Sequence, residues 1–142
     1  MTQGNDSEIL TSSQEQFAQY VKEQLRMAVR MTLVTVLEEE VQAVVGAKPY
    51  ERSAQRRDQR NGHYTRSLDT TMGHIEDLPV PRTRHGHQTQ LFERYQRRRE
   101  ELDQAIGEMF VKGVSTSKVG EVMETLTGTK PSASTVSRVF HS

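Results

Sequence analysis

The sequence has no cysteine, which excludes disulfide bonds, thiol chemistry and zinc sites built from cysteine. It also has no long hydrophobic run. The longest apolar-rich stretch, residues 27–37, has eleven residues and is interrupted by Arg30, which is well below the roughly 18 to 20 residues needed to cross a bilayer. The N-terminus is polar and acidic and lacks the order of a secretion signal. We therefore expect a soluble, cytoplasmic protein with no membrane partner.

Net charge is absent as well, because nineteen Lys and Arg balance nineteen Asp and Glu. The balance hides a strong local bias. Residues 1–49 contain four bases and seven acids, residues 50–99 contain eleven and six, and residues 100–142 contain four and six. All eleven bases of the middle segment are arginines, so any polyanion partner is expected there. With 142 residues, 33% hydrophobic and 27% charged, the chain is too short for a large enzyme and favours extended helical pieces.

The pattern of apolar residues predicts a mainly α-helical fold with one small β-hairpin. Residues 1–12 are expected to form a disordered lead. Ser13 and Gln16 form a capping-box signature for a long helix over residues 13–49, which Gly46 and Pro49 should end. Apolar residues recur along it at spacings of three and four. This helix either packs on its own domain or forms a coiled-coil-like seam for oligomerisation.

Residues 50–87 are expected to form an arginine-rich helix followed by a hairpin. The helix is predicted over residues 50–60. Two strands are predicted over residues 64–71 and 74–80, joined by a tight turn across Met72-Gly73. Pro79 and Pro81 are expected to fray the second strand because proline cannot donate to a ladder. Residues 82–86 read as a basic connector.

Residues 88–142 are predicted to be helical, with breaks that resemble a helix-turn-helix unit. One helix is expected from residue 88 to Gly113, a second from Ser115 to Gly128, and a last one from Ser132 or Ser134. In a helix-turn-helix the last helix enters the major groove of DNA. The alternative is a plain helical cap whose last helix has ordinary polar residues outside.

Two groups of residues are candidates for contact with DNA. Arg52, Arg56 and Arg60 would form one stripe on the predicted helix, with no acid three or four positions away to relieve their repulsion. Such a stripe favours an external polyanion such as phosphate, the alternative being a solvated face. The predicted last helix offers small donors and one arginine for base edges. The complete predicted set is Arg52, Arg56, Arg57, Arg60, Arg66, Arg82, Arg84, Ser134, Thr135, Ser137 and Arg138.

Other charged clusters carry less functional information. Arg97 lies four residues from both Glu93 and Glu101, and Arg99 four from Asp103, which predicts solvated ion pairs on a helix. Neither the acids between residues 58 and 77 nor the histidines between residues 63 and 87 form a persuasive metal site, and an exposed polar connector is favoured. No catalytic residue, metal ligand or cofactor is predicted. The residues set aside here are Asp58, Asp69, Glu76, Asp77, His63, His85 and His87.

Three segments together resemble a known family. They are Tyr50-Glu51-Arg52, RNGHYTRSLDTTMGHIEDLPVPRTRHG at residues 60–86, and FVKGVSTSKVGEVMETLTGTKPSASTVSRVF at residues 110–140. In this order they are similar to the N-terminal part of Mutator-type transposases of bacterial insertion sequences. The resemblance covers about residues 38–142.

The resemblance implies a protein that binds the terminal inverted repeats of its element in double-stranded DNA, through the arginine-rich region and the helix-turn-helix. The catalytic part of that family is a ribonuclease-H-like fold in which two aspartates and a glutamate hold divalent metal ions. It is expected to begin beyond residue 142, and no acid in this chain matches the triad.

We therefore expect the DNA-binding portion of a transposase, nucleoid-associated in a bacterial cytoplasm, as a homo-oligomer or a hetero-oligomer with full-length transposase. The alternatives are a truncated regulator of transposition that acts by hetero-oligomerisation or by occupying the ends, or an inert remnant.

Overall fold

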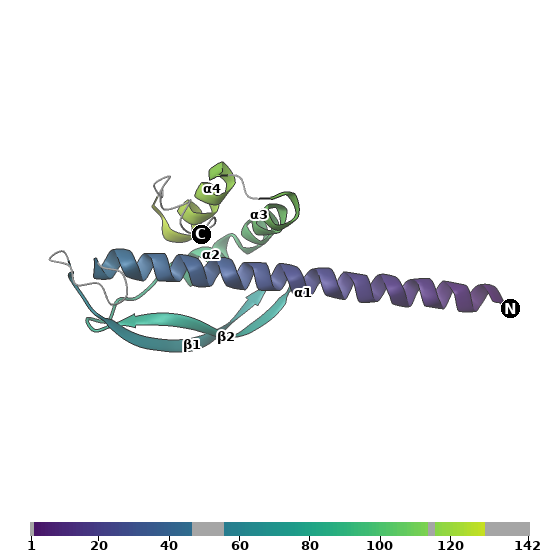
Figure 1. Ribbon diagram of the computed structural model, residues 1–142, viewed down its shortest axis with the longest axis horizontal. Coiled ribbons are helices and arrows are strands. Elements are labelled where there is room, and N and C mark those ends of the chain that lie inside the picture. Colours follow the sequence, from purple (N-terminus) through teal and green to yellow (C-terminus); the bar gives the residue numbers. More distant parts are fainter. Residues whose placement is uncertain (1, 47–55, 114–115, 130–142) are drawn as a thin grey trace.

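A computed structural model describes residues 2–46, 56–113 and 116–129 of the chain. Within them, a long helix α1 (Thr2–Val45) precedes the hairpin of β1 (Arg60–Thr70) and β2 (Gly73–Thr83). Three shorter helices follow: α2 (Leu91–Arg97), α3 (Arg99–Lys112) and α4 (Thr116–Thr127). In Figure 1 the hairpin lies along one side of the C-terminal half of α1, and α2 to α4 lie along another side. The fold is mainly helical with one hairpin, as the sequence predicts.

Helix α1 is longer than predicted. It begins at Thr2, so the expected disordered lead over residues 1–12 is wrong for residues 2–12, and the helix runs through the capping-box signature at Ser13. Its C-terminal end is as predicted, because the helix stops at Val45 and Gly46 has the left-handed φ of 76° that suits glycine.

The C-terminal half of α1 packs on its own domain, which was one of the two readings of its periodicity. Its buried residues recur every three or four positions, so they share one side of the helix. The N-terminal half extends beyond the hairpin and the other helices (Figure 1). The buried apolar residues of α1 are Val29, Leu33, Val36, Leu37, Val41 and Val45, and Thr32 is buried beside them.

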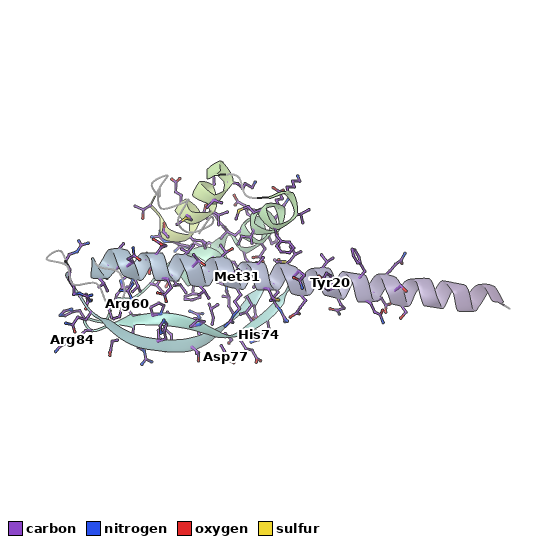
Figure 2. The ribbon with its side chains drawn as sticks, in the orientation of Figure 1. Tyr20, Met31, Arg60, His74, Asp77 and Arg84 are labelled. Carbon is purple, nitrogen blue, oxygen red and sulfur yellow. The ribbon has the colours of Figure 1, made fainter. Side chains whose placement is uncertain are left out.

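The hairpin turn lies one residue before the predicted Met72-Gly73, and both strands are longer than predicted. Thr70 pairs with Gly73, which leaves Thr71 and Met72 in the loop, and the hydroxyl of Thr70 donates to the carbonyl of Gly73 at 2.6 Å. His74 marks the turn end of the hairpin and Arg84 its open end in Figure 2.

The expected fraying at the prolines is wrong. Pro79 pairs with Thr65 and Pro81 with His63, and β2 continues to Thr83. Since the two prolines are two residues apart, their nitrogens point to the same side of the strand. In this two-stranded sheet one side of β2 faces β1 and the other side is an outer edge without ladder hydrogen bonds. Proline is tolerated where its nitrogen points to such an edge, because no hydrogen bond is lost there.

The helix predicted from residue 88 to Gly113 is divided in two. Arg98 leaves the helical conformation, with φ −128° and ψ 32°, between α2 and α3. The break allows Tyr95 on α2 to donate to a carboxylate oxygen of Asp103 on α3 at 2.6 Å. Thr71 in the hairpin turn donates to the other oxygen from its backbone N–H at 2.9 Å and its hydroxyl at 2.6 Å. Asp103 is therefore a buried junction and not the solvated partner of Arg99 that the spacing predicts.

Burial and this hydrogen bond also affect Tyr95 itself. Burial, followed by the hydrogen bond to Asp103, raises the pKa of the Tyr95 phenol far above its ordinary value. The phenol therefore stays protonated and remains a donor to Asp103 throughout the neutral range.

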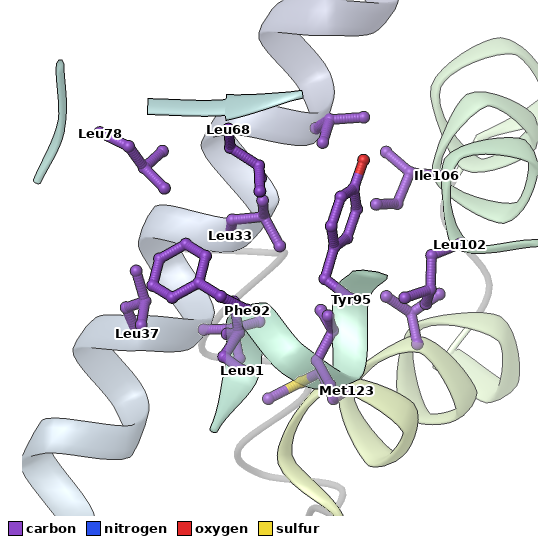
Figure 3. Packing of buried hydrophobic residues seen from close by; sticks show 14 of the residues in the cluster. Leu33, Leu37, Leu68, Leu78, Leu91, Phe92, Tyr95, Leu102, Ile106 and Met123 are labelled. Carbon is purple, nitrogen blue, oxygen red and sulfur yellow. The ribbon is translucent and has the colours of Figure 1, made fainter. Parts of the chain in front are cut away.

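One hydrophobic cluster joins all six elements (Figure 3). Leu33 of α1 lies at its centre, near Leu68 of β1, Phe92 and Tyr95 of α2. Helix α4 contributes residues 119, 122, 123 and 126, whose spacing matches the predicted inward face. Gly128, just past α4, has a φ of 77°. The predicted last helix lies outside the described residues, so the helix-turn-helix arrangement is not confirmed.

Candidate nucleic-acid interface

Backbone hydrogen bonds tie the open end of the hairpin to the end of α1. The N–H of Arg57 donates to the carbonyl of Val45 at 2.8 Å, and its guanidinium donates to the carbonyl of Ala43 at 3.0 Å. The N–H of Arg84 donates to the carbonyl of Gln59 at 2.8 Å. These bonds fix the segment before β1 against the segment after β2, so residues far apart in the sequence share one surface.

Five of the predicted DNA-binding arginines gather there. Three lie at the start of β1 or just before it, and two lie at the end of β2 or just after it. The two groups are close because Arg60 pairs with Thr83 in the ladder. Figure 2 shows Arg60 and Arg84 at the same end of the molecule. We call this surface the arginine end; it consists of Arg56, Arg57, Arg60, Arg82 and Arg84.

The helical stripe predicted for Arg52, Arg56 and Arg60 is wrong. Residues 56–59 are not helical and Arg60 is the first residue of β1. Arg52 lies outside the described residues. Strand pairing and the hydrogen bonds to the end of α1 bring these arginines together. The four-residue spacing of Arg52, Arg56 and Arg60 in the sequence, from which the stripe was predicted, plays no part. Ser134, Thr135, Ser137 and Arg138 also lie outside the described residues.

Asp58 is the anchor beneath the arginine end. One of its carboxylate oxygens accepts from the N–H of Gln59 at 2.7 Å, the N–H of His85 at 3.2 Å and the ring Nδ1 of His85 at 2.7 Å. Burial raises the pKa of Asp58, but the hydrogen bonds from Gln59, His85 and Thr83 outweigh it and lower the pKa to about 2. Asp58 is therefore ionised at neutral pH, and its carboxylate accepts hydrogen bonds from groups of the same chain.

Two further histidine–carboxylate pairs hold the hairpin on α1. Nε2 of His63 lies 3.1 Å from a carboxylate oxygen of Glu38, and Nε2 of His87 lies 2.9 Å from one of Glu40. The sequence interpretation placed these histidines in an exposed connector and missed their partners on α1. A signal was available, because the run Glu38-Glu39-Glu40 is an unusual concentration of acid near the end of a packed helix.

These pairs do not make a metal site. Within the described residues no three His, Asp or Glu side chains are grouped so that they could hold a metal ion. The divalent ions implied for the family's catalytic part therefore find no fitting donor set in this part of the chain, and we derive no chemistry from them.

Two arginines of the predicted set stack on aromatic rings. The guanidinium of Arg66 lies 4.0 Å from the ring centre of Phe92, and that of Arg82 lies 5.1 Å from the ring centre of Tyr64. Phe92 is buried, so Arg66 covers the core and acts in folding. Tyr64 is exposed, so Arg82 is oriented at the surface. Sequence reasoning missed Tyr64, which only the strand register places beside Arg82.

The arrangement defines the class of protein by its architecture: a mainly helical domain that presents several arginines at the open end of a hairpin. Comparison with known proteins identifies the class: the family described as "Transposase, Mutator family" matches residues 1–142. The chain belongs to the Mutator family of transposases. In the described residues, no helix has the length and apolar character that a bilayer span requires.

Individual relatives make the likeness more specific. The chain is 45% identical over 116 residues to the transposase for insertion sequence element ISRM5 of Rhizobium meliloti, a match that covers 81% of this chain and 29% of the relative. It is 50% identical over 94 residues to the transposase for IS256 in transposon Tn4001 of Staphylococcus aureus, covering 66% and 24%. It is 34% identical over 125 residues to the transposase for IS1081 of Mycobacterium tuberculosis, covering 87% and 30%. The chain thus spans about a quarter to a third of the length of these relatives.

Proposed function

We propose that this chain is the DNA-binding portion of an insertion-sequence transposase, and that the arginine end contacts the phosphates of the element's terminal inverted repeats. The observation that carries the proposal is the gathering of five arginines from two separate segments on one braced surface. The planar guanidinium suits phosphate oxygens, and contacts to phosphate supply most of the sequence-independent affinity for DNA.

Three acids close to this surface are engaged by other groups. Asp58 is buried and accepts from Gln59 and His85, while Glu38 and Glu40 pair with histidines. Arg84 is exposed, and its guanidinium lies 3.4 Å from the side-chain oxygen of Gln59, which is a neutral acceptor. A phosphate that approaches Arg84 therefore meets a guanidinium whose neighbour is uncharged.

The proposal assigns different roles within the predicted set. Arg82 and Arg84 are the first choices for phosphate contact, because their side chains are exposed on the open end. Arg66 supports the fold through Phe92. Contact with base edges or phosphates in the groove is assigned, from the pattern of the predicted last helix, to Ser134, Thr135, Ser137 and Arg138. The proposal thus separates a positioning surface from a sequence-reading segment.

The test is a salt series of binding by the purified chain to the inverted repeat of its own element and to a scrambled duplex of equal length. Arg82→Ala and Arg84→Ala should each weaken binding to both duplexes by a similar factor, and should each reduce the slope of log K against log salt by about one. Arg138→Ala should weaken the repeat more than the scrambled duplex.

The matched control is Arg97→Ala. Arg97 is exposed on α2 but lies in a cleft where Arg94, Arg97 and Arg98 are accompanied by four glutamates, so its removal should leave binding unchanged. If Arg97→Ala weakens binding as much as Arg84→Ala, the arginine end is not the contact surface and the effect is one of net charge alone.

A second candidate is a regulator that forms inactive hetero-oligomers with a longer transposase. The uncovered apolar face of α1 favours it, since Phe17 and Met31 are both more than 60% exposed. Addition of this chain to a transposition assay would then inhibit excision even when Arg84→Ala removes DNA binding. Inhibition that disappears with Arg84→Ala would instead indicate competition for the ends.

A further inference from the structure

Strand β1 is exposed along its whole first part. In a strand that packs one face on a core, buried and exposed residues alternate. In β1 this alternation begins only at Leu68, and every residue from 61 to 67 is exposed. The core contacts of this part of the hairpin come from β2, in which Leu78 and Val80 are buried and which packs on α1. Neither face of residues 61–67 is buried, and we call this segment the open half of β1.

The charge of the hairpin differs between its two ends. Residues 59–68 and residues 78–84 contain no Asp or Glu, whereas the part near the turn contains Asp69, Glu76 and Asp77. Figure 2 shows Arg60 and Arg84 at one end of the hairpin and Asp77 toward the other. Glu38 of α1 approaches the open half, and its carboxylate pairs with His63. The open half of β1 therefore continues the arginine end along the strand without an acid of its own.

The two outer edges of the hairpin also differ. Pro79 and Pro81 of β2 lie opposite Thr65 and His63 of β1. Proline is tolerated in a ladder where its nitrogen points away from the partner strand. In such a pair the N–H of the opposite residue points outward as well. The pairing therefore turns the N–H groups of Thr65 and His63 toward the outer edge of β1, where they can donate to an acceptor outside the chain.

A bulge opens the backbone at the start of this edge. The register shifts between Arg60 and His63, and Gly62 has a φ of 68°. A Cβ added at Gly62 would meet nothing within 4 Å. Glycine within a strand often marks a place where a ligand or another backbone comes close. The open half of β1 thus combines an accessible backbone with exposed polar side chains.

We infer that the open half of β1 lies in the major groove of double-stranded DNA, while the arginine end contacts the phosphates at the border of that groove. The inference rests on the function proposed above and adds the place of the duplex on the chain. Charge selects this occupant, because an acid-free strand beside five arginines suits a polyanion. The major groove is about 12 Å wide and admits a two-stranded ribbon, whereas the minor groove, about 6 Å wide, is too narrow.

The side chains of the open half have separate roles in this arrangement. Asn61 and Thr65 are exposed and are assigned to base edges, because an amide can pair with adenine and a threonine offers both a hydroxyl and a methyl group. Tyr64 is a positioning residue, since its ring centre lies 5.1 Å from the guanidinium of Arg82. Seven extended residues span about 23 Å, which corresponds to about seven base pairs.

The first test places a negative charge on the open half of β1. Thr65→Glu should weaken binding of the full chain to the inverted repeat and to the scrambled duplex by about tenfold or more, because the new carboxylate faces the DNA. Gln19→Glu, an exposed substitution on α1 with the same change of charge, is the matched control and should bind like the natural chain. Since both positions are exposed, urea unfolding of both variants should resemble that of the natural chain.

The second test identifies the groove. The chain has no cysteine, so the thiol of Thr65→Cys is unique. It should form a disulfide with duplexes that carry a tethered thiol on N4 of cytosine, which lies in the major groove, at a few neighbouring positions of the repeat. Duplexes with the tether on N2 of guanine, which lies in the minor groove, should not react. Gln19→Cys should react with neither set.

The role of Tyr64 has its own measurement. Tyr64→Phe keeps the ring beneath Arg82 and should bind both duplexes like the natural chain, whereas Tyr64→Ala should weaken both. In the Arg82→Ala background, Tyr64→Ala should cause little further loss, because the residue acts through Arg82. An equal loss in both backgrounds would remove the positioning role.

Three results would overturn the placement in the major groove. They are Thr65→Glu that binds like Gln19→Glu, cross-linking of Thr65→Cys only to the minor-groove tether, and cross-linking to neither tether. Arg84→Ala separates these results from a failure of the proposed function. If Arg84→Ala still weakens binding to both duplexes, the arginine end remains the phosphate contact and only the place of the duplex is wrong. If Arg84→Ala binds like the natural chain, the proposed function fails as well.

Discussion

Asp58 shows how a single residue organises the arginine end. It is one acid among arginines in the sequence, where nothing marks it as different from the other acids near the hairpin. In the structure it is buried, and it accepts hydrogen bonds from two backbone N–H groups and from His85. Its anion therefore ties the segment before β1 to the segment after β2, which keeps Arg57 and Arg84 on the same surface.

Acid should weaken this junction. The pKa of Asp58 is lowered from 3.8 to about 2 in the folded chain, since hydrogen bonds outweigh burial. A lowered pKa in the folded state contributes stability that is complete above about pH 4 and is lost as the pH falls through about 2. Urea unfolding between pH 5 and pH 2 should show this loss, and Asp58→Asn should be less stable at pH 5 and lose less on acidification.

Asp69→Asn is the control for that experiment. Asp69 also pairs with a histidine, His74, but its side chain is 73% exposed, so its removal should leave the slope of stability against pH near that of the natural chain. Equal slopes for the natural chain and Asp58→Asn would show that Asp58 is not a source of acid sensitivity.

At the scale of elements, the sequence predicts those whose signals are local. The end of α1 at Gly46, the two-residue turn before Gly73 and the end of α4 at Gly128 all follow from glycine, and each has a positive φ in the structure. The break at Arg98 has no such signal, because its cause is the tertiary junction of Tyr95, Asp103 and Thr71.

The arginine end was predicted for the wrong reason. The sequence places its residues in the arginine-rich middle segment, and their role in DNA binding stays a prediction. The helix over residues 50–60 rests on spacing alone, without an apolar face to support it. The arginines at the start of β1 lie near those at the end of β2 because of the strand register. The register cannot be derived from the predicted ends of the two strands. Tyr64 and the acids of α1 were missed because their partners are far away in the sequence.

Two glycines of the α4 region provide a matched test of local conformation. Gly128 has a φ of 77°, and a Cβ added there would lie 1.6 Å from a guanidinium nitrogen of Arg94. Gly120 lies within α4, where an added Cβ meets nothing within 4 Å. Gly128→Ala should reduce the free energy of unfolding by about 1–2 kcal/mol, and Gly120→Ala should raise it by about 0.5–1 kcal/mol. Urea unfolding of both variants checks the pair, and a destabilised Gly120→Ala would mean that α4 is crowded at that position.

At the scale of the whole molecule, α1 is the element on which the others assemble. It contacts both strands as well as α3 and α4, and the main core cluster has residues from every element. The hairpin and the shorter helices therefore have no separate cores within the described residues. The same helix leaves Phe17 and Met31 exposed, so its packing in the fold uses one side of the element.

This architecture predicts cooperative unfolding. Leu33 is fully buried on α1 between the hairpin and the shorter helices, so Leu33→Ala should lower the free energy of unfolding by about 2–5 kcal/mol. The loss should appear equally in far-ultraviolet circular dichroism, which reports the helices, and in the near-ultraviolet signal of the buried Tyr95, since removal of a shared support weakens both. The control is Lys22→Ala, an exposed substitution whose free energy of unfolding should lie within about 0.5 kcal/mol of that of the natural chain. All variants are measured at one protein concentration. Two separate transitions in Leu33→Ala would show that the surroundings of Tyr95 on α2 unfold apart from the rest of the helical structure, and α1 would then be a connector and not the common support.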